Sequence, residues 1–287
     1  MVKKIKLYTE LSRINRPVGI LLLALPCLFG VFLALKGNDN FSVGNAIKII
    51  ALFIFGSISM RSAGCVINDI LDRNFDKKIA RTKLRPLAND TLNLRQALVF
   101  LAFLLLISLF ILLQFNSYTI ASGLLALVLV VLYPLMKRIT FYPQIFLGVT
   151  FNYGILMAGL AINQTVSVAG VTLFLACVIW TLIYDTIYAF QDIEDDATVG
   201  VKSSAIKFAS RPQVTLAVLT LTMFALIFYV GFLQNFGEKF YFFAAVAFFY
   251  ELFLILKCNY ASPALCLEAF KANVVVGILI LLAIISG

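Results

Sequence analysis

The fold is decided by residues 46–76, which read AIKIIALFIFGSISMRSAGCVINDILDRNFD. The run 46–67 is almost entirely apolar and is long enough for a membrane-spanning helix, which needs about 20 such residues. The acidic string NDILDRNFD follows at 68–76 without a break. The sequence therefore predicts a membrane helix that carries several carboxylates to one face of the bilayer.

The composition extends this interpretation to the whole chain. Of its 287 residues, 62% are hydrophobic and 13% are charged, whereas about a quarter of the residues of a soluble domain are charged. Apolar runs of spanning length lie at 17–35, 46–67, 97–113, 118–136, 143–162, 168–190, 214–233, 240–256 and 272–286. They predict an all-α, polytopic membrane helix bundle of about nine transmembrane helices, forming a single domain over 1–287.

Two breaks between the runs are long and polar, at about 68–96 and 191–213. We expect them to form a cap over the active site. In the first break, Asn93 with Gln96 three residues later is typical of a capping box that starts a helix. Pro143 is expected at the first position of its helix, where the missing N–H costs least.

The basic residues predict the orientation in the membrane. If the N-terminus lies inside, most of the 23 Lys and Arg residues fall at helix ends on that face, and the opposite face carries Lys36, Lys48 and Lys239. Cytoplasmic loops are enriched in Lys and Arg, so we expect a cytoplasmic N-terminus. With a net charge of +9, this asymmetry indicates topology and anionic partners at one membrane face rather than nucleic acid.

Histidine is absent from the sequence. This excludes a His-dependent catalytic triad, a His-ligated haem or zinc and a His proton relay. The five cysteines contain no CxxC pair and are expected to be small buried thiols. Chemistry must therefore rest on carboxylates, cations, hydroxyls or a bound metal.

Eight of the 14 acidic residues form two clusters, each after an even-numbered span: Asp69, Asp72 and Asp76, and then Asp185, Asp192, Glu194, Asp195 and Asp196. Even-numbered spans end at the same face, so the clusters can meet. At about 100° per residue, a helix places the first cluster, Arg61 and Asn68 within an arc of about 100°. The same spacing places Asp185, Asp192 and Asp196 within about 40°, with Asp195 beside them and Glu194 on the far side.

Packed carboxylates repel unless they are protonated or bridged by a cation. Mg²⁺ commonly binds through one or two carboxylates plus the phosphates of a substrate. The cations between the acids, Arg73, Lys77, Lys83, Arg85 and Lys202, suit a diphosphate. A diphosphate at the mouth of an apolar bundle predicts a lipid tail among the helices, as in an allylic isoprenyl diphosphate. The alternative is that the acids are solvated helix ends, paired with Arg73, Lys77, Lys78 and Lys202.

The two acidic strings resemble the signature motifs of the UbiA family of intramembrane prenyltransferases. NDILDRNFD at 68–76 is similar to the family's NDxxDxxxD motif, and DIEDD at 192–196 to its DxxxD motif. Several flanks most resemble members that act on 4-hydroxybenzoate: RINRPVGILLLALP at 13–26, DKKIARTKLRPLA at 76–88, YPLMKRITFYPQIFLG at 133–148 and YDTIYAFQDIEDDATVGVKSSAI at 184–206.

The resemblance implies transfer of a polyprenyl group from its diphosphate to the ring carbon ortho to the hydroxyl of 4-hydroxybenzoate, in ubiquinone biosynthesis. It implies that Mg²⁺ is held by Asn68, Asp69, Asp72, Asp76, Asp192, Asp195 and Asp196. The expected catalytic residues are Asp72, Asp192 and Asp196. The expected substrate-binding residues are Arg61, Asn68, Arg73, Lys77, Lys83, Arg85, Arg138, Asp185, Tyr188 and Lys202.

Two basic residues keep alternative roles. Arg138 is expected either to pair with a benzoate carboxylate or to be a positive-inside anchor after the run 118–136. Arg61, inside the span 46–67, is expected to reach a substrate anion or to form an ion pair with Asp69 or Asp72.

Other functions remain open from the sequence. Family resemblance also allows haem, homogentisate or a naphthoate as the acceptor. A transporter is a rival from another class, but it predicts acids near the bilayer midplane. A bacterial cell inner membrane with a cytoplasmic active site is the simpler location, because no transit-like segment is evident. Prenyl chain length and oligomeric state cannot be predicted.

Overall fold

The computed structural model describes residues 2–36, 38, 41–79 and 81–287, and within these ranges it consists of helices, turns and loops without a strand. The prediction of an all-α bundle is confirmed. In the described ranges, nine helices are long and apolar enough to cross a membrane. The chain is thus a multi-pass membrane protein.

The spanning segments follow one another along the chain. They are α2 (Val18–Leu35), α3 (Val43–Asp76), α4 (Leu94–Leu112), α5 (Ser117–Leu132) continued by η1 (Tyr133–Leu135) and α6 (Met136–Ile139), α7 (Pro143–Asn163), α8 (Val168–Ala189) continued by η2 (Phe190–Asp192) and α9 (Ile193–Val199), α11 (Pro212–Leu233), α12 (Glu238–Lys257) and α13 (Pro263–Ser286). Two shorter helices, α1 (Val2–Leu11) and α10 (Ser204–Phe208), accompany them.

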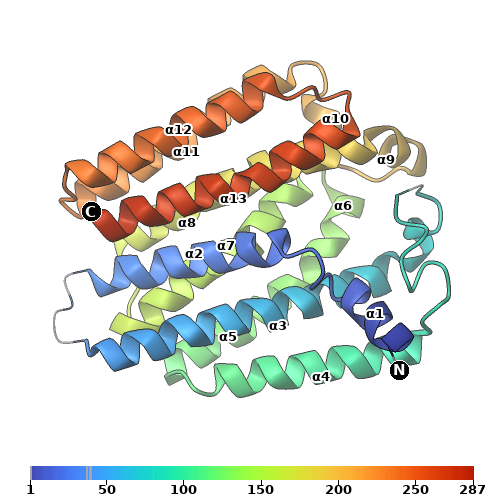
Figure 1. Cartoon of the computed structure of the whole chain (residues 1–287), viewed down its shortest axis with the longest axis horizontal. Helices are drawn as coiled ribbons and strands as arrows, with labels where there is room; N and C mark the ends of the chain where they lie inside the picture. The colour runs from blue at the N-terminus through green and yellow to red at the C-terminus, as the bar shows by residue number, and fades with distance from the viewer. Residues whose placement is uncertain (1, 37, 39–40, 80) are drawn as a thin grey trace.

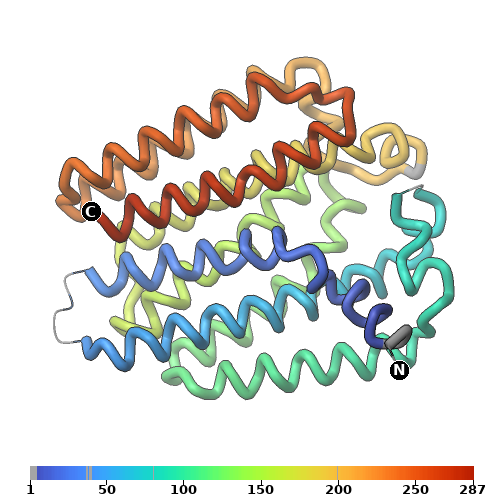
Figure 2. Tube along the Cα trace, in the orientation of Figure 1, coloured from blue at the N-terminus to red at the C-terminus, as the bar shows by residue number. Residues whose placement is uncertain are grey.

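The long helices lie side by side and expose two ends of the bundle (Figure 1). We call the end where α3 stops at Asp76 and α8 stops at Ala189 the acidic end. At the opposite, far end, α2 stops at Leu35 and α3 begins at Val43. The tube in Figure 2 shows that α1 and the connecting residues 77–79, 81–93 and 200–211 also gather at the acidic end. The two long polar segments of the sequence therefore lie at the same end of the molecule.

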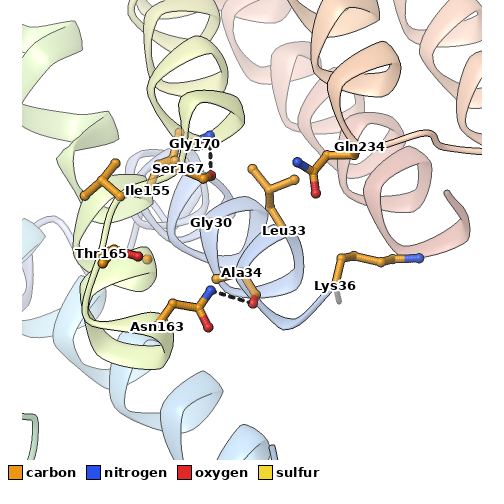
Figure 3. Close-up of a pocket in the computed structure, with 12 residues that line it drawn as sticks. Gly30, Leu33, Ala34, Lys36, Ile155, Asn163, Thr165, Ser167, Gly170 and Gln234 are labelled. Atoms are coloured by element: carbon orange, nitrogen blue, oxygen red, sulfur yellow. Dashed lines mark hydrogen bonds between the residues drawn. The ribbon is translucent and has the colours of Figure 1, made fainter. Parts of the chain in front are cut away.

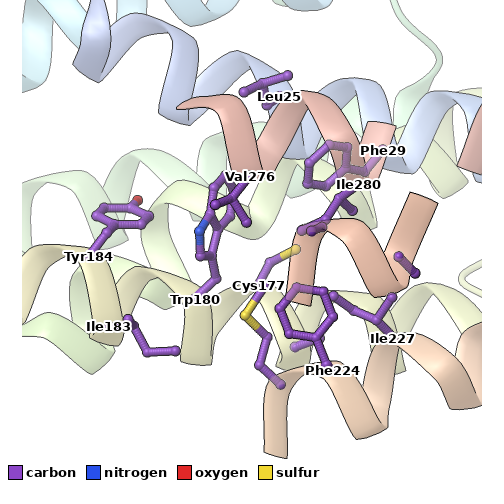
Figure 4. Close-up of a cluster of buried hydrophobic side chains, with 14 of the residues drawn as sticks. Leu25, Phe29, Cys177, Trp180, Ile183, Tyr184, Phe224, Ile227, Val276 and Ile280 are labelled. Carbon is purple, nitrogen blue, oxygen red and sulfur yellow. The ribbon is translucent and has the colours of Figure 1, made fainter. Parts of the chain in front are cut away.

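The largest buried cluster surrounds α8, which packs against α2, α7, α11 and α13. Figure 4 shows Trp180 of α8 beside Val276 of α13, and the Trp180 ring centroid lies 6.1 Å from that of Phe29 in α2. Trp180 donates its indole N–H to the Asn273 side-chain oxygen over 2.8 Å, so this buried polar group is paired. This packing fixes the helix that leads to the second acidic motif.

A glycine allows α2 and α7 to approach closely. A Cβ atom added to Gly30 would lie 2.7 Å from the Ile155 Cα atom and 2.8 Å from its carbonyl oxygen. Real Cβ contacts are longer than this, and the neighbour is backbone, so no small rotation relieves the clash. Gly30 therefore fixes the spacing of these two helices near the far end.

The observed helix ends agree in part with those predicted from the sequence. The capping box of Asn93 and Gln96 is present at the start of α4, and Pro143 begins α7. Residues 68–76 continue α3, as the helical phasing of Asp69, Asp72 and Asp76 assumed, so the polar break begins after Asp76 rather than at residue 68. The break 191–213 likewise contains the short helices α9 and α10.

Candidate active site

The first acidic motif lies on the last two turns of α3. Spacings of three and four residues place Asp69, Asp72 and Asp76 on one helix face, and all three are at least 95% buried. Arg13 binds the Asp69 carboxylate with a guanidinium N–O distance of 2.5 Å. Arg85, from the connection after α3, reaches Asp69 at 3.2 Å and Asp76 at 2.8 Å. These buried carboxylates are thus held by arginines from other segments.

Asp72 is 1% exposed and is paired differently. Lys137 of α6 donates to one carboxylate oxygen, Oδ2. The Arg138 guanidinium lies 3.7 Å from the other, Oδ1, and donates a hydrogen bond to the Leu71 carbonyl over 2.9 Å. Within the part of the chain that the structure describes, Asp72 Oδ1 accepts no hydrogen bond. A buried acceptor in this state has capacity for one more cationic or N–H partner.

The second motif is joined to the loop after the first motif by Arg81. Its guanidinium binds both carboxylate oxygens of Asp192, with Nε–O distances of 2.8 and 3.0 Å, and donates to the Tyr188 hydroxyl over 2.9 Å. Burial alone would lower the pKa of Arg81, but the hydrogen bond with Asp192 and the electrostatic interactions with Tyr188 and Asp192 together outweigh that effect, so the pKa is raised. Residues 111 positions apart therefore meet at the acidic end.

Other predicted cations lie around this centre. Arg73 and Lys77 bind Asp90, with Lys77 Nζ at 2.8 Å. Hydrogen bonds from Lys77 and then from Arg73 lower the pKa of Asp90 below its usual value. Lys202 donates to the Ile139 carbonyl over 3.0 Å, and its backbone N–H donates to the Lys137 carbonyl. This contact ties the segment after the second motif to the lysine that binds Asp72.

The segment that carries the acids of the second motif is a less regular helix than the sequence suggested. The helix that carries Asp185, Asp192 and Asp196 is interrupted, because α8 ends at Ala189 and a 3-10 turn precedes α9. Asp185, Asp195 and Asp196 are nevertheless all partly buried, and Glu194 is exposed, as helical phasing predicted. The interruption begins at Phe190, whose ring packs edge-on against the Tyr260 ring, with 4.9 Å between the centroids.

Arg61 lies within α3, well inside the bundle. Its guanidinium stacks over the Phe151 ring at 5.1 Å from the centroid. Among the residues that the structure describes, no carboxylate lies within 4.0 Å of it, so the expected ion pair with Asp69 or Asp72 is absent there. Asn68 is partly buried one turn before Asp72, and Lys83 is exposed. Lys83 is therefore the predicted residue with the least support from the structure.

Three site residues escaped the sequence analysis: Arg13, Arg81 and Lys137. Each lies in a stretch that carried the family resemblance, namely 13–26, 76–88 and 133–148. Their charge alone gave no signal, because the flanks contain several other cations. Arg13 adopts a positive φ of 55°, which turns the chain after α1 and brings the side chain to Asp69.

The donor chemistry of the site suits a hard divalent cation. Asp and Asn oxygens are the ligands that Mg²⁺ prefers, and Asp72 Oδ1 is buried without a donor among the described residues. In the ranges 2–36, 38, 41–79 and 81–287, no three Asp, Glu or Cys side chains already cluster closely enough to hold a metal. The carboxylates are instead held by Arg and Lys. A metal would therefore have to replace some of these ion pairs.

A small cavity of about 100 Å³ lies elsewhere, at the far end. Figure 3 shows Gly30, Leu33 and Ala34 of α2 beside Asn163 and Ser167, with Lys36 at the rim. Asn163 donates to the Ala34 carbonyl over 2.9 Å, which ties the ends of α2 and α7. No acid of either motif lines this cavity. It is separate from the candidate active site.

Known proteins resemble this chain over most of its length. Residues 23–280 match the model of the UbiA prenyltransferase family. The chain is 41% identical to the mitochondrial 4-hydroxybenzoate polyprenyltransferase of Schizosaccharomyces pombe, over 98% of this chain and 80% of that protein. It is 37% identical to the 4-hydroxybenzoate octaprenyltransferase of Blochmanniella pennsylvanica, over 100% and 97% of the two chains.

A solved structure shares the fold. It is that of a UbiA homolog from Archaeoglobus fulgidus bound to DMAPP and Mg²⁺, with a TM-score of 0.70 and 22% sequence identity over 97% of this chain and 99% of that one.

Proposed function

This chain belongs to the UbiA prenyltransferase family, and from that premise we propose that it transfers a polyprenyl group from polyprenyl diphosphate to 4-hydroxybenzoate. The new bond forms at the ring carbon ortho to the hydroxyl, in ubiquinone biosynthesis. The observation that carries the proposal is the meeting of Arg81 and Asp192 at the acidic end, in a chain that is 41% identical to a 4-hydroxybenzoate polyprenyltransferase.

The diphosphate is bound, in this proposal, by the cations that now hold the carboxylates. Arg81, Arg85 and Lys137 each bind an acid of one motif, and all three can turn toward a polyanion that enters between the motifs. As the allylic C–O bond breaks, negative charge grows on the departing diphosphate. Nearby Lys and Arg side chains stabilise that charge where it develops.

We assign the metal to the oxygen ligands of the two motifs. Asn68, Asp69, Asp72 and Asp76 would hold it from α3, and Asp192, Asp195 and Asp196 from the second motif. When bound, Mg²⁺ offsets diphosphate charge and so makes the diphosphate a better leaving group. The unsatisfied Oδ1 atom of Asp72 supports this assignment.

The aromatic acid needs a cation for its carboxylate and a base for its proton. Arg138 and Arg61 are the candidates for the carboxylate, since a guanidinium can bind it with two hydrogen bonds. The ring carbon attacks the allylic carbon as the C–O bond breaks, and a carboxylate of the second motif, Asp192 in our assignment, accepts the proton that is released. Asp185 and Tyr188 both lie on α8, just before the second motif, and complete the substrate contacts.

The apolar helices next to this site accommodate the prenyl chain. The expected location is a cell inner membrane with the acidic end and the N-terminus in the cytoplasm, as the distribution of Lys and Arg predicts.

The decisive experiment incubates the detergent-purified protein with geranyl diphosphate and 4-hydroxybenzoate, with Mg²⁺ or with excess chelator. We expect a C-prenylated 4-hydroxybenzoate only when the metal is present. Formation of the product at the same rate in chelator would contradict the metal assignment. Homogentisate, a naphthoate and haem, added as competing acceptors, test the acceptor, and preferred prenylation of any of them would contradict 4-hydroxybenzoate.

A further inference from the structure

A second groove lies at the acidic end, on the outside of the bundle between α1 and α4. It has a volume of about 430 Å³ and is lined by Tyr8, Arg95, Gln96, Val99, Phe100 and Phe103. Figure 1 shows α1 lying across the beginning of α4, away from α8 and the second motif. None of the proposed catalytic or metal residues lines it. It is a separate candidate site.

The groove is polar at one end and apolar along its length. Arg95, Val99 and Phe103 are spaced four residues apart, so they form one stripe along the first turns of α4. Val99 is 66% exposed and Phe103 57% exposed. The stripe therefore starts with a cation at the end of the membrane helix and continues as apolar surface toward the membrane interior, over about 12 Å.

Arg95 differs from the arginines of the site. Arg81 and Arg85 are bound to carboxylates, whereas Arg95 is exposed and has no carboxylate within 4.0 Å among the residues that the structure describes. The Tyr8 ring packs on Phe100 at 4.9 Å. A phosphate at the mouth of the groove would meet an uncompensated guanidinium in a groove that Tyr8 also lines.

We propose that this groove binds one anionic phospholipid, with its phosphate on Arg95 and an acyl chain along Val99 and Phe103, and that the bound lipid stabilises α1. Lipids contact every outward apolar face of a membrane protein. A retained lipid needs a groove together with a charged anchor, and this groove provides both. An anionic headgroup is favoured because Lys6 of α1 is also exposed at this end.

The bound lipid can affect the active site indirectly, through the contacts of α1. Leu11 at the end of α1 is fully buried, in a cluster with Ala97 and Leu104 of α4. The chain then turns at Arg13, whose guanidinium binds Asp69 at 2.5 Å. A lipid that holds α1 against α4 therefore also holds the arginine that pairs with the first acidic motif.

Native mass spectrometry of the full chain in detergent tests the site. The probes are phosphatidylglycerol and phosphatidylcholine with the same acyl chains. We expect one retained phosphatidylglycerol, and about fivefold weaker retention in Arg95→Gln, the factor that corresponds to about 1 kcal/mol. Arg211→Gln is the matched control, because Arg211 is exposed at the start of α11 and does not line the groove.

A second pair of variants tests the apolar part. Val99→Trp fills the groove and is expected to lower phosphatidylglycerol retention. Val218→Trp changes a valine of similar exposure, 56%, on α11 and is expected to have no effect. Both side chains face outward, so neither change needs the core to rearrange. Equal retention of the two lipids by the unchanged protein, or equal retention by the two members of either variant pair, would overturn the proposal.

Hydrogen exchange tests the effect on α1 without measuring activity. In nanodiscs, the amides of residues 8–13 are expected to exchange more slowly with phosphatidylglycerol than with phosphatidylcholine. Arg95→Gln should remove that difference, and Arg211→Gln should leave it. If the unchanged protein exchanges equally in both lipids, the stabilisation of α1 is refuted.

Discussion

At the scale of single residues, the site is organised by carboxylates that are buried but paired. An isolated buried charge is costly, whereas a paired and hydrogen-bonded one is tolerated. Asp69, Asp76 and Asp192 are each held by arginine, and Asp72 by Lys137. The same contacts place cations and acids side by side, where a metal and a diphosphate need them.

Neutral substitutions of the acids test their chemical role. Asp72→Asn and Asp192→Asn keep the size of the side chain but remove its charge, so prenyl transfer is expected to fall about 100-fold or more. The rate of product formation measures this, and gel filtration in detergent confirms that the variants remain folded. Unchanged turnover in both variants would contradict the assigned roles.

Glu194→Gln is the matched control for these variants. Glu194 belongs to the same acidic string, but its side chain is exposed, whereas Asp195 and Asp196 are partly buried. We expect its activity to stay within about twofold of the unchanged protein, since surface substitutions usually have small effects. A large loss would place Glu194 inside the site and would contradict the helical phasing that puts it on the far side of its helix.

At the scale of helices, the close contact of α2 and α7 depends on Gly30. Gly30→Ala is expected to lower the free energy of unfolding by about 1–3 kcal/mol, the usual cost of overpacking, because the added methyl group meets the backbone of Ile155. Thermal unfolding in detergent measures the change.

Gly44→Ala serves as its control. An added Cβ atom on Gly44, near the start of α3, meets no atom within 4 Å. Alanine favours the helix by up to about 1 kcal/mol over glycine, so this variant is expected to be unchanged or slightly more stable. Equal destabilisation by both variants would show that the contact between α2 and α7 is not the cause.

Much of the helix arrangement could be predicted from the sequence, because apolar runs of spanning length depend only on local composition. The capping box at Asn93 and the shared helix face of Asp69, Asp72 and Asp76 also follow local rules. The 3-10 turn after Ala189 could not be predicted, since it accompanies the packing of Phe190 on Tyr260 from a distant loop. Arg13 and Arg81 likewise reach the acids only through the folded connections that carry them.

At the scale of the whole molecule, both acidic motifs and the N-terminus are at one end of the bundle. A membrane-impermeant maleimide tests this arrangement, because the five native cysteines are buried and give little background. Lys83→Cys at the acidic end is expected to react from one side of sealed vesicles, and Gly44→Cys at the far end from the other. Labelling of both from the same side would contradict the arrangement.

The ion pairs between the motifs have a consequence for the resting enzyme. Because Asp69, Asp72, Asp76 and Asp192 already have basic partners, a stray phosphate or chloride can bind these cations only by leaving a carboxylate unpaired. A ligand can replace all of these ion pairs at once only if it carries charges of both signs. A magnesium ion would bind the aspartates, and a pyrophosphate would bind the arginines and the lysine. Selectivity for a metal-loaded substrate thus arises before any bond is broken.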